Sequence, residues 1–134
     1  MADRFLKLYE DLYSQGLPYT LLEVRFTPEG HDQTMLGAGR GRRSGWIDLV
    51  CNDSDGFELY YAAAVDLIKE IGARPHLGKF CDGLTAADLE KVHGDSFRSF
   101  LDLVAAHDPS GKFANAFTRR LFGPPPLDAN AGAA

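Results

Sequence analysis

The sequence predicts a small α+β fold in which an antiparallel sheet is covered by helices. Two observations carry this prediction. Hydrophobic residues recur at three- and four-residue steps near the N-terminus and again from residue 60, as they do on amphipathic helices. Between these stretches, residues 19–27 and 45–50 alternate apolar and polar side chains, as half-buried strands do. The order helix, strand, strand, helix and then further helices is typical of this class.

Length and composition are those of an ordinary globular chain. The 134 residues are 45% hydrophobic and 25% charged, with a formal net charge of −5, which argues against a general role at nucleic acids or membrane surfaces. The length suits one domain, which we place at residues 1–123. Residues 124–134 have nothing to bury and are expected to form a disordered tail.

Signals for targeting, metal binding and redox chemistry are weak. No hydrophobic run approaches the roughly 20 residues that cross a bilayer, and charges interrupt the N-terminal segment where a signal peptide would be apolar. Cys51 and Cys81 stand far apart without metal-binding or redox spacing, so no metal site is predicted. We expect a cytoplasmic, reducing compartment.

Two helices have clear hydrophobic faces. The first is expected over residues 3–15 and ends at Gly16. Its face consists of Phe5, Leu8, Tyr9, Leu12 and Tyr13. The second ends with Gly72 as its C-terminal cap. Its face consists of Tyr60, Ala64, Leu67, Ile68 and Ile71.

Two strands are expected at residues 19–27 and 45–50, joined by a long glycine-rich loop over residues 28–45. In the first strand, one face carries Leu22, Val24 and Phe26 and the other carries Glu23, Arg25 and Thr27. In the second strand, one face carries Trp46, Asp48 and Val50 and the other carries Ile47 and Leu49. Residues 51–56 are expected to form a turn.

Three short helices are expected in the C-terminal part. Thr85 and Asp88 form a variant capping box for a helix that ends near Val92, and Asp95 is expected to cap the next helix. The face of that helix consists of Phe97, Phe100, Leu101 and Val104. A turn at residues 108–111 precedes a last helix that runs to about Phe122.

Glu23 and Arg25 are the first candidates for a functional site. Because they are two residues apart on a strand, they project from the same face. Such residues most often form a solvated strand face with a surface ion pair. The alternative is that this face lines a cleft, where a carboxylate and a guanidinium together hold a polar substrate.

The glycine- and arginine-rich segment at residues 36–43 resembles a phosphate-binding loop in composition only. A dinucleotide fingerprint requires GxGxxG between a strand and a helix, whereas here GxGxG is followed by a second strand. We therefore interpret the segment as a flexible basic hairpin loop rather than as a phosphate cradle.

His76 and Lys79 share a non-helical segment with Pro75 and Gly78. Pro75 disfavours helix at the residue before it, and Gly78 permits an unusual backbone angle or a close approach. Lys79 is therefore either a counter-charge for a ligand or a solvated loop cation. The remaining histidines have no second ligand at metal spacing and are interpreted as surface or capping residues: His31, His93 and His107.

Four segments in order resemble one family. They are LLEVRFT at residues 21–27, GRGRRSGWIDLV at 39–50, IGARPHLGKF at 71–80 and HDPSGKFANAFTRRLFG at 107–123. Together they are similar to the C-terminal portion of sugar-1,4-lactone oxidases and alditol oxidases, which are flavoproteins of the vanillyl-alcohol-oxidase superfamily. The similarity runs from about residue 17 to residue 123. It implies that the fold is part of the cap domain of such a flavoprotein.

The resemblance also implies a chemistry, which is oxidation of a sugar lactone or polyol by hydride transfer to FAD. By position, Glu23 and Arg25 match the catalytic, substrate-binding acid and guanidinium that hold the reacting hydroxyl. Asp48 lies near the position of a polar substrate contact of the family, so it is either such a substrate-binding residue or an ordinary strand residue. Lys79 matches a catalytic lysine beside the pyrimidine edge of the flavin, and His76 matches a motif histidine that orients this segment or contacts flavin or substrate.

The chain also departs from the family pattern. Leu77 replaces the usual aromatic residue, and the loop at residues 35–43 differs from the family's, so the substrate is not specified. Nothing resembles the N-terminal FAD-binding domain. The resemblance therefore implies an FAD-binding domain or subunit, or self-association, and predicts that the isolated chain holds no FAD and does not turn over. The alternatives are a non-catalytic interaction or assembly module derived from such an oxidase, and a small ligand-binding domain without redox chemistry.

Overall fold

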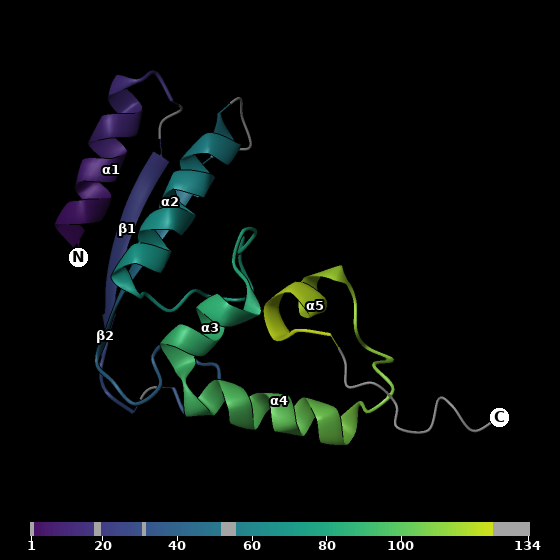
Figure 1. Ribbon diagram of the computed structural model, residues 1–134. Helices are drawn as coiled ribbons and strands as arrows, with labels where there is room; N and C mark the ends of the chain where they lie inside the picture. The colour runs from purple at the N-terminus through teal and green to yellow at the C-terminus, as the bar shows by residue number, and fades with distance from the viewer. Residues whose placement is uncertain (1, 18–19, 31, 52–55, 125–134) are drawn as a thin grey trace. The chain divides into compact units, whose positions relative to one another are not determined.

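The computed structural model describes residues 2–17, 20–30, 32–51 and 56–124. Within these residues lie five helices and a two-stranded antiparallel sheet, which confirms the predicted α+β class. Their order along the chain is α1 (Ala2–Ser14), β1 (Thr20–Thr27), β2 (Ser44–Cys51), α2 (Phe57–Ile71), α3 (Ala86–His93), α4 (Asp95–His107) and α5 (Ala116–Phe122) (Figure 1). The chain divides into two compact units, Met1–Gly83 and Leu84–Ala134. The placement of a single domain at residues 1–123 stays a prediction.

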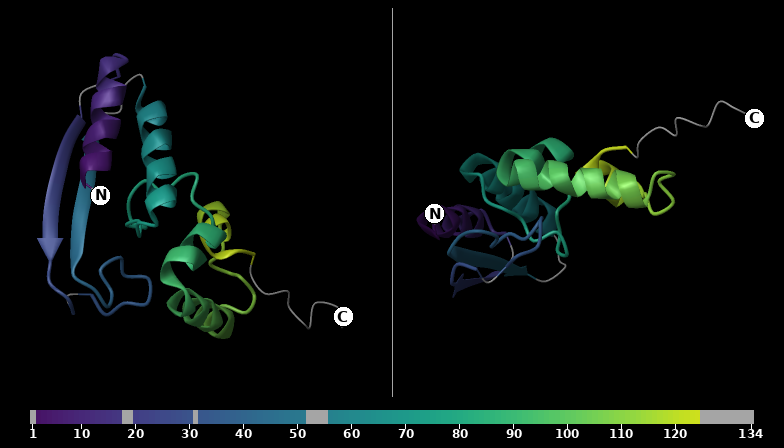
Figure 2. Two further views of the ribbon diagram at one scale, coloured as in Figure 1. Left: turned by 60° about the vertical axis from the view of Figure 1, so that its left-hand side comes forward. Right: turned by 90° about the horizontal axis from the view of Figure 1, so that it is seen from below.

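The first unit is a β-hairpin with two helices on one face. Figures 1 and 2 show α1 and α2 side by side on the same side of the two strands. The strands pair without a break from Thr20 opposite Cys51 to Thr27 opposite Ser44. Directly opposite residues of an antiparallel pair share a face of the sheet. The register therefore places Leu22, Val24, Ile47 and Leu49 on one face, and the charged residues on the other face together with Leu21, Trp46 and Val50.

Each helix of this unit buries only part of its predicted hydrophobic face, and Tyr13 on that face of α1 is 60% exposed. Phe5 of α1 is buried, as are Tyr60, Ala64 and Leu67 of α2. The prediction that Gly72 caps α2 is confirmed, because this residue adopts the left-handed conformation with φ of 64°. Ordinary side chains avoid that conformation, whereas glycine adopts it without strain. The amide of Ala73 then donates to the carbonyl of Ile68 at 3.1 Å, which completes a helix-ending turn.

The apolar face of the hairpin is less buried than the alternation predicts. Leu22 and Ile47 are half-buried, but Val24 is exposed and the side chain of Phe26 is 79% exposed. The prediction that Phe26 lies on a covered face is therefore wrong. The physical reason is that Phe26 lines an open groove at the end of the hairpin, together with residues of the loop that joins the strands.

The second unit consists of α3, α4 and α5, which pack around Leu89, Phe97 and Leu121. The predicted capping box of α3 is confirmed, since Thr85 accepts from the amide of Asp88 and the Asp88 carboxylate accepts from the amide of Thr85. A second capping box, formed by Asn115 and Thr118, begins α5. This second box was not predicted from the sequence.

Two predictions for this unit are wrong. The N-terminal cap of α4 is Gly94, and Asp95 is instead the first helical residue, where its carboxylate accepts from Arg98 Nη1 at 2.6 Å. His93 is only 6% exposed, so it belongs to the interior of the unit rather than to the surface. Its position at the end of an amphipathic helix, one turn after Leu89, explains this burial.

Several expectations concern residues that the structure does not describe. The tail from residue 125, the turn residues 52–55 and His31 all lie outside the described residues. The turn at residues 108–111 is described and confirmed, with the Gly111 amide donating to the Asp108 carbonyl at 3.0 Å. None of the helices in the described part of the chain combines the length and the hydropathy that crossing a bilayer requires.

Candidate functional site

Three predicted site residues meet on the charged face of the hairpin. Glu23 of β1 lies directly opposite Asp48 of β2, and Arg25 is two residues further along β1 on the same face. Arg25 Nη2 donates to Asp48 Oδ2, and Arg25 Nε lies 3.4 Å from Glu23 Oε1. We call these three residues the charged triad. The structure therefore brings together the acid and the guanidinium that the sequence singled out.

The charged triad is accessible to solvent, and its guanidinium offsets the repulsion between its two carboxylates. The side chains of Arg25 and Glu23 are 59% and 50% exposed. Like charges directly opposite each other on neighbouring strands destabilise a sheet, and a guanidinium in contact with both carboxylates offsets that repulsion. The hydrogen bond to Asp48, followed by the charges of Asp48 and Glu23, raises the pKa of Arg25 above its ordinary value. Arg25 therefore keeps its charge throughout the working range of pH.

The triad leaves hydrogen-bonding capacity for a ligand. A guanidinium has five N–H groups, and the contacts to Glu23 and Asp48 use two of its nitrogens. Each carboxylate oxygen has two lone pairs, so Glu23 can accept a further hydrogen bond. A polar hydroxyl at this face can consequently donate to Glu23 while it accepts from Arg25. This pair of roles is the one that the resemblance implies.

His76 and Lys79 form a second predicted group, in the segment after α2. His76 Nδ1 accepts from the amide of Gly78 at 3.1 Å, and the His76 carbonyl accepts from the amide of Lys79 at 3.0 Å. A Cβ at Gly78 would lie 2.9 Å from His76 Cε1, so the predicted close approach at this glycine is confirmed. Because Nδ1 accepts, the neutral imidazole carries its hydrogen on Nε2.

The turn at residues 76–79 is held by the residues that follow it. Phe80 packs edge-on against Phe57 and Tyr61 of α2, with ring centroids 5.3 Å and 5.8 Å apart. Cys81 is buried in the same unit as a free thiol. The side chains of His76 and Lys79 are themselves exposed. The residues that follow the turn are thus packed in the unit, while the imidazole of His76 and the ammonium of Lys79 are exposed to solvent.

The two groups are not joined by a described interaction. In the described part of the chain, no hydrogen bond or ion pair links the charged triad to His76 or Lys79. The pairing of Arg25 with Asp48 was not predicted, because the strand alternation contains no information about register. The structure thus supplies one assembled group on the hairpin and one anchored turn after α2.

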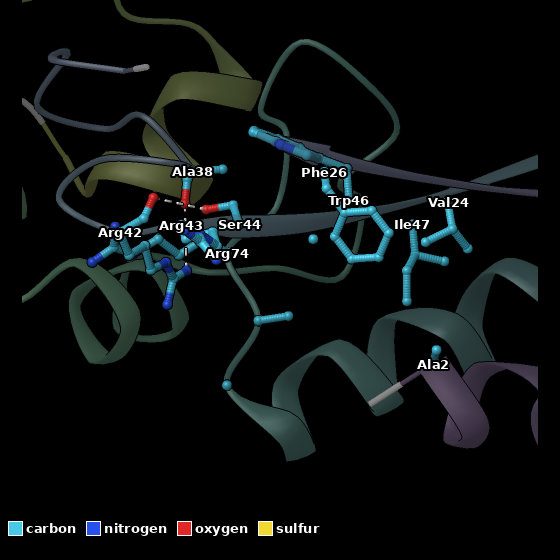
Figure 3. A pocket seen from close by; sticks show the side chains of 13 residues that line it. Ala2, Val24, Phe26, Ala38, Arg42, Arg43, Ser44, Trp46, Ile47 and Arg74 are labelled. Carbon is cyan, nitrogen blue, oxygen red and sulfur yellow. Dashed lines mark hydrogen bonds between the residues drawn. The ribbon is translucent and has the colours of Figure 1, made fainter. Parts of the chain in front are cut away.

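The groove of the first unit is lined by residues other than those of the two groups. It has a volume of about 360 Å³ and is lined by residues of α1, both strands, the loop between the strands and the segment after α2. None of the five predicted site residues, Glu23, Arg25, Asp48, His76 and Lys79, lines it. The groove is therefore a separate feature, and Figure 3 shows its lining side chains.

One residue of this groove, Arg74, was missed by sequence reasoning. Arg74 is half-buried, and its Nη1 donates to the carbonyl of Arg40 at 3.0 Å. Burial, and then the positive charges of Arg42 and Arg40, lower the pKa of Arg74 below its ordinary value. No local sequence pattern predicts this contact, since 34 positions separate its two residues.

The loop between the strands is a hairpin loop, as the sequence predicts. It leads into β2 and not into a helix, so the exclusion of a dinucleotide fingerprint is confirmed. Successive turns bend it, with amides of Gly37, Arg40 and Arg42 donating to carbonyls three residues earlier. Gly37 is buried against the carboxylate of Asp32, which a Cβ at this position would overlap. The loop therefore has a defined backbone path.

Comparisons with known proteins support the resemblance to sugar-lactone oxidases. Residues 17–121 match the family described as D-arabinono-1,4-lactone oxidase. L-gulonolactone oxidase of Mus musculus is 27% identical over 121 residues, which make up 87% of this chain and 27% of the relative. L-gulonolactone oxidase of Bos taurus is 30% identical over 105 residues, or 75% of this chain and 23% of the relative.

A bacterial relative shows the same coverage. L-gulono-1,4-lactone dehydrogenase of Mycobacterium tuberculosis is 32% identical over 105 residues, or 77% of this chain and 23% of the relative. The chain thus spans about a quarter of the length of the curated relatives that it matches. No solved structure matches it. Lactone oxidases of this kind are in general FAD-dependent oxidoreductases. On the strength of the match to residues 17–121, the chain belongs to the D-arabinono-1,4-lactone oxidase family.

Proposed function

We propose that residues 1–123 are the C-terminal substrate-domain part of an FAD-dependent oxidoreductase that acts on a CH–OH group of a sugar lactone or polyol. This part is incomplete without an FAD-binding domain or subunit. The family match supports the reaction class, and the share of the relatives that the chain spans supports a partial role. The observation that carries the proposal is the accessible charged triad of Glu23, Arg25 and Asp48.

The triad suits the proton chemistry of alcohol oxidation. Conversion of CH–OH to a carbonyl releases one proton from oxygen and one hydride from carbon. Arg25 donates to the hydroxyl oxygen and fixes its position, while the carboxylate of Glu23 accepts the hydroxyl proton. Asp48 accepts from Arg25 Nη2, and we assign it the role of a positioning residue that sets the direction of the guanidinium beside the substrate. FAD, when bound, supplies the acceptor for the hydride.

The turn at residues 76–79 carries a positive charge and a hydrogen-bond donor that suit FAD, the cofactor of the family. Lys79 is exposed, and no ion pair with a described carboxylate neutralises its ammonium group. A fixed positive charge stabilises negative charge that develops on a reduced ring system. The Nε2–H of His76, directed by the bond that Nδ1 receives from Gly78, is a second donor in the same turn. We assign both residues to the cofactor side of the site.

A partner is part of the proposal, because apolar surface is left uncovered. Phe26, Phe80 and Phe113 are large aromatic side chains that are mostly exposed to solvent. Among the described residues the sheet consists of β1 and β2, so each of these strands has an edge without a described partner strand. Exposed aromatic side chains and free strand edges are typical of interaction surfaces. We propose that an FAD-binding domain or subunit covers them, with a second copy of the chain as the alternative occupant.

The decisive experiment places the chain in a complete oxidase. In a chimera, this chain replaces the matching segment of mouse L-gulonolactone oxidase, and bound flavin is first verified by its visible absorbance. Oxygen uptake is then measured with L-gulono-1,4-lactone, D-arabinono-1,4-lactone and a polyol. We expect turnover with at least one of them. A chimera that binds FAD but oxidises none of the three would contradict the proposal. The isolated chain mixed with FAD should remain colourless after gel filtration.

A second candidate function is a non-catalytic interaction or assembly module derived from such an oxidase. The observation that favours it is that the charges of the triad already contact one another, as in an ordinary surface ion-pair cluster. Under this alternative, substitution of Glu23 or Arg25 leaves the partner interaction unchanged. Pull-down of the FAD-binding segment by wild-type and substituted chains, run beside the oxidation assay, separates the two functions.

A further inference from the structure

The groove of the first unit has two chemically different ends. Figure 3 shows the side chains of Arg42, Arg43 and Arg74 gathered at one end and those of Phe26 and Ile47 toward the other. Guanidinium groups are planar, permanently charged donors whose geometry matches the oxygens of phosphate and carboxylate groups. An apolar wall next to such a cluster suits the organic part of the same ligand. The groove is therefore positively charged at one end and apolar at the other.

The structure assigns this groove to the binding of a small organic oxyanion, whose phosphate or carboxylate group contacts the arginines while its apolar part lies against Phe26 and Ile47. The site is separate from the charged triad and from the turn at residues 76–79, none of whose predicted residues lines the groove. It therefore does not depend on the proposed function. Its volume of about 360 Å³ is within the range of small-molecule sites.

The arginines at this end are held close together. Arg74 follows the glycine cap of α2, and its bond to the carbonyl of Arg40 ties the segment after α2 to the loop between the strands. Arg42 Nη2 lies 3.4 Å from the carbonyl of Ala38 within the same loop. The guanidinium groups of Arg74 and Arg42 are therefore preorganised, which reduces the entropy lost when a ligand binds.

The electrostatics of the cluster favour an anion. Burial and the neighbouring charges of Arg42 and Arg40 lower the pKa of Arg74, which means that its charged form is disfavoured where it stands. An oxyanion at this position offsets that cost by direct attraction. Arg43 is exposed and forms no ion pair with a carboxylate of the described residues. Its guanidinium is therefore available for contact with a ligand.

The test uses the full chain alone and four probes. Phenyl phosphate and benzoate combine an oxyanion with an apolar ring, inorganic phosphate lacks the ring, and benzyl alcohol lacks the charge. Binding is followed by chemical shift changes in the ¹⁵N-labelled chain. We expect saturable binding of phenyl phosphate or benzoate, with shifts at Gly45, Ile47 and Ala73, and weaker binding of inorganic phosphate and benzyl alcohol. The order of phenyl phosphate and benzoate identifies the preferred oxyanion.

Matched variants locate the site. Arg43→Gln removes one groove charge at an exposed position, and Arg119→Gln removes one charge from the exposed face of α5 in the other unit. We expect Arg43→Gln to weaken phenyl phosphate binding about tenfold and Arg119→Gln to leave it unchanged. Phe26→Ser should weaken phenyl phosphate while inorganic phosphate is unaffected. Retained folding of each variant is verified by circular dichroism.

Three results would overturn the assignment. The first is that neither phenyl phosphate nor benzoate binds saturably. The second is that benzyl alcohol binds as tightly as these two anions, and the third is that Arg43→Gln and Arg119→Gln weaken phenyl phosphate binding equally. The last would mean that only the net charge of the chain matters. Because no flavin and no oxidation enter this experiment, its failure is distinguishable from a failure of the proposed oxidase function.

Discussion

Glu23 and Asp48 lie directly opposite each other on β1 and β2, and the guanidinium of Arg25 contacts both carboxylates. Two acids placed opposite each other on a sheet repel, so this arrangement depends on the arginine between them. The consequence for function is that Arg25 has a defined direction. A hydroxyl that binds beside it meets a donor and an acceptor at fixed positions, which is a requirement for oriented proton transfer.

Asp48→Asn tests the positioning role of this carboxylate. The substitution removes the partner that contributes most to the raised pKa of Arg25 while keeping the side-chain shape. Because the triad is at the surface, we expect an unfolding midpoint close to that of the wild type. In the chimera, the KM for the lactone should rise several-fold with a smaller change in kcat. Asp102→Asn, at an exposed site on α4, removes the same charge and serves as control.

Lys79→Met tests the charge in the turn after α2. Methionine preserves the length and apolar stem of the side chain but removes the ammonium. We expect the rate of flavin reduction in the chimera to fall about tenfold or more, since a positioned charge near a developing anion is typically worth that much. Lys91→Met, on the exposed surface of α3, is the matched control. Equal rates for wild type and Lys79→Met would remove Lys79 from the proposed site.

Gly37→Ala tests the path of the loop between the strands. A Cβ at Gly37 would overlap the carboxylate of Asp32, so this carboxylate must leave the amide and hydroxyl of Thr34 from which it accepts, and we expect a loss of about 1–3 kcal/mol in the free energy of unfolding. At Gly39 the nearest atom would be Trp46 Cζ2 at 3.4 Å, which is an ordinary contact. Gly39→Ala should therefore change stability by less than about 0.5 kcal/mol. Urea denaturation of both variants measures the difference; equal losses would contradict the described loop.

Leu89→Ala tests the core of the second unit. Leu89 is 0% exposed on α3, whereas Leu103 on α4 is 44% exposed. Truncation of a buried leucine leaves a cavity and typically costs about 2–5 kcal/mol of unfolding free energy. We expect Leu89→Ala to fall in that range and Leu103→Ala to cost much less. Similar thermal shifts for both variants would mean that α3 does not form the core of this unit.

The helices and strands could be predicted from the sequence because their signals are local. The capping box of Thr85 and Asp88 and the glycine cap at Gly72 lie within a few residues of the helix ends that they mark. Burial could not be predicted as well. Phe26 alternates like a covered strand residue but lines an open groove, and His93 is polar but lies inside the second unit.

The candidate site could be predicted only in part, because some of its contacts join residues that are far apart in the sequence. Glu23 and Arg25 share a face by simple alternation, so their proximity follows from the strand itself. The contact between Arg25 and Asp48 requires the register of the hairpin, and the contact between Arg74 and the Arg40 carbonyl requires the tertiary fold. Neither is contained in a periodic pattern.

The central claim is that Glu23 accepts the hydroxyl proton while Arg25 holds the hydroxyl. The most direct measurement is the rate of flavin bleaching when lactone is mixed anaerobically with the FAD-loaded chimera, for wild type, Glu23→Gln and the exposed-loop control Glu29→Gln. The account predicts that Glu23→Gln slows bleaching about a hundredfold or more while Glu29→Gln bleaches at the wild-type rate. Bleaching at the wild-type rate in Glu23→Gln, with flavin fully bound, would contradict it.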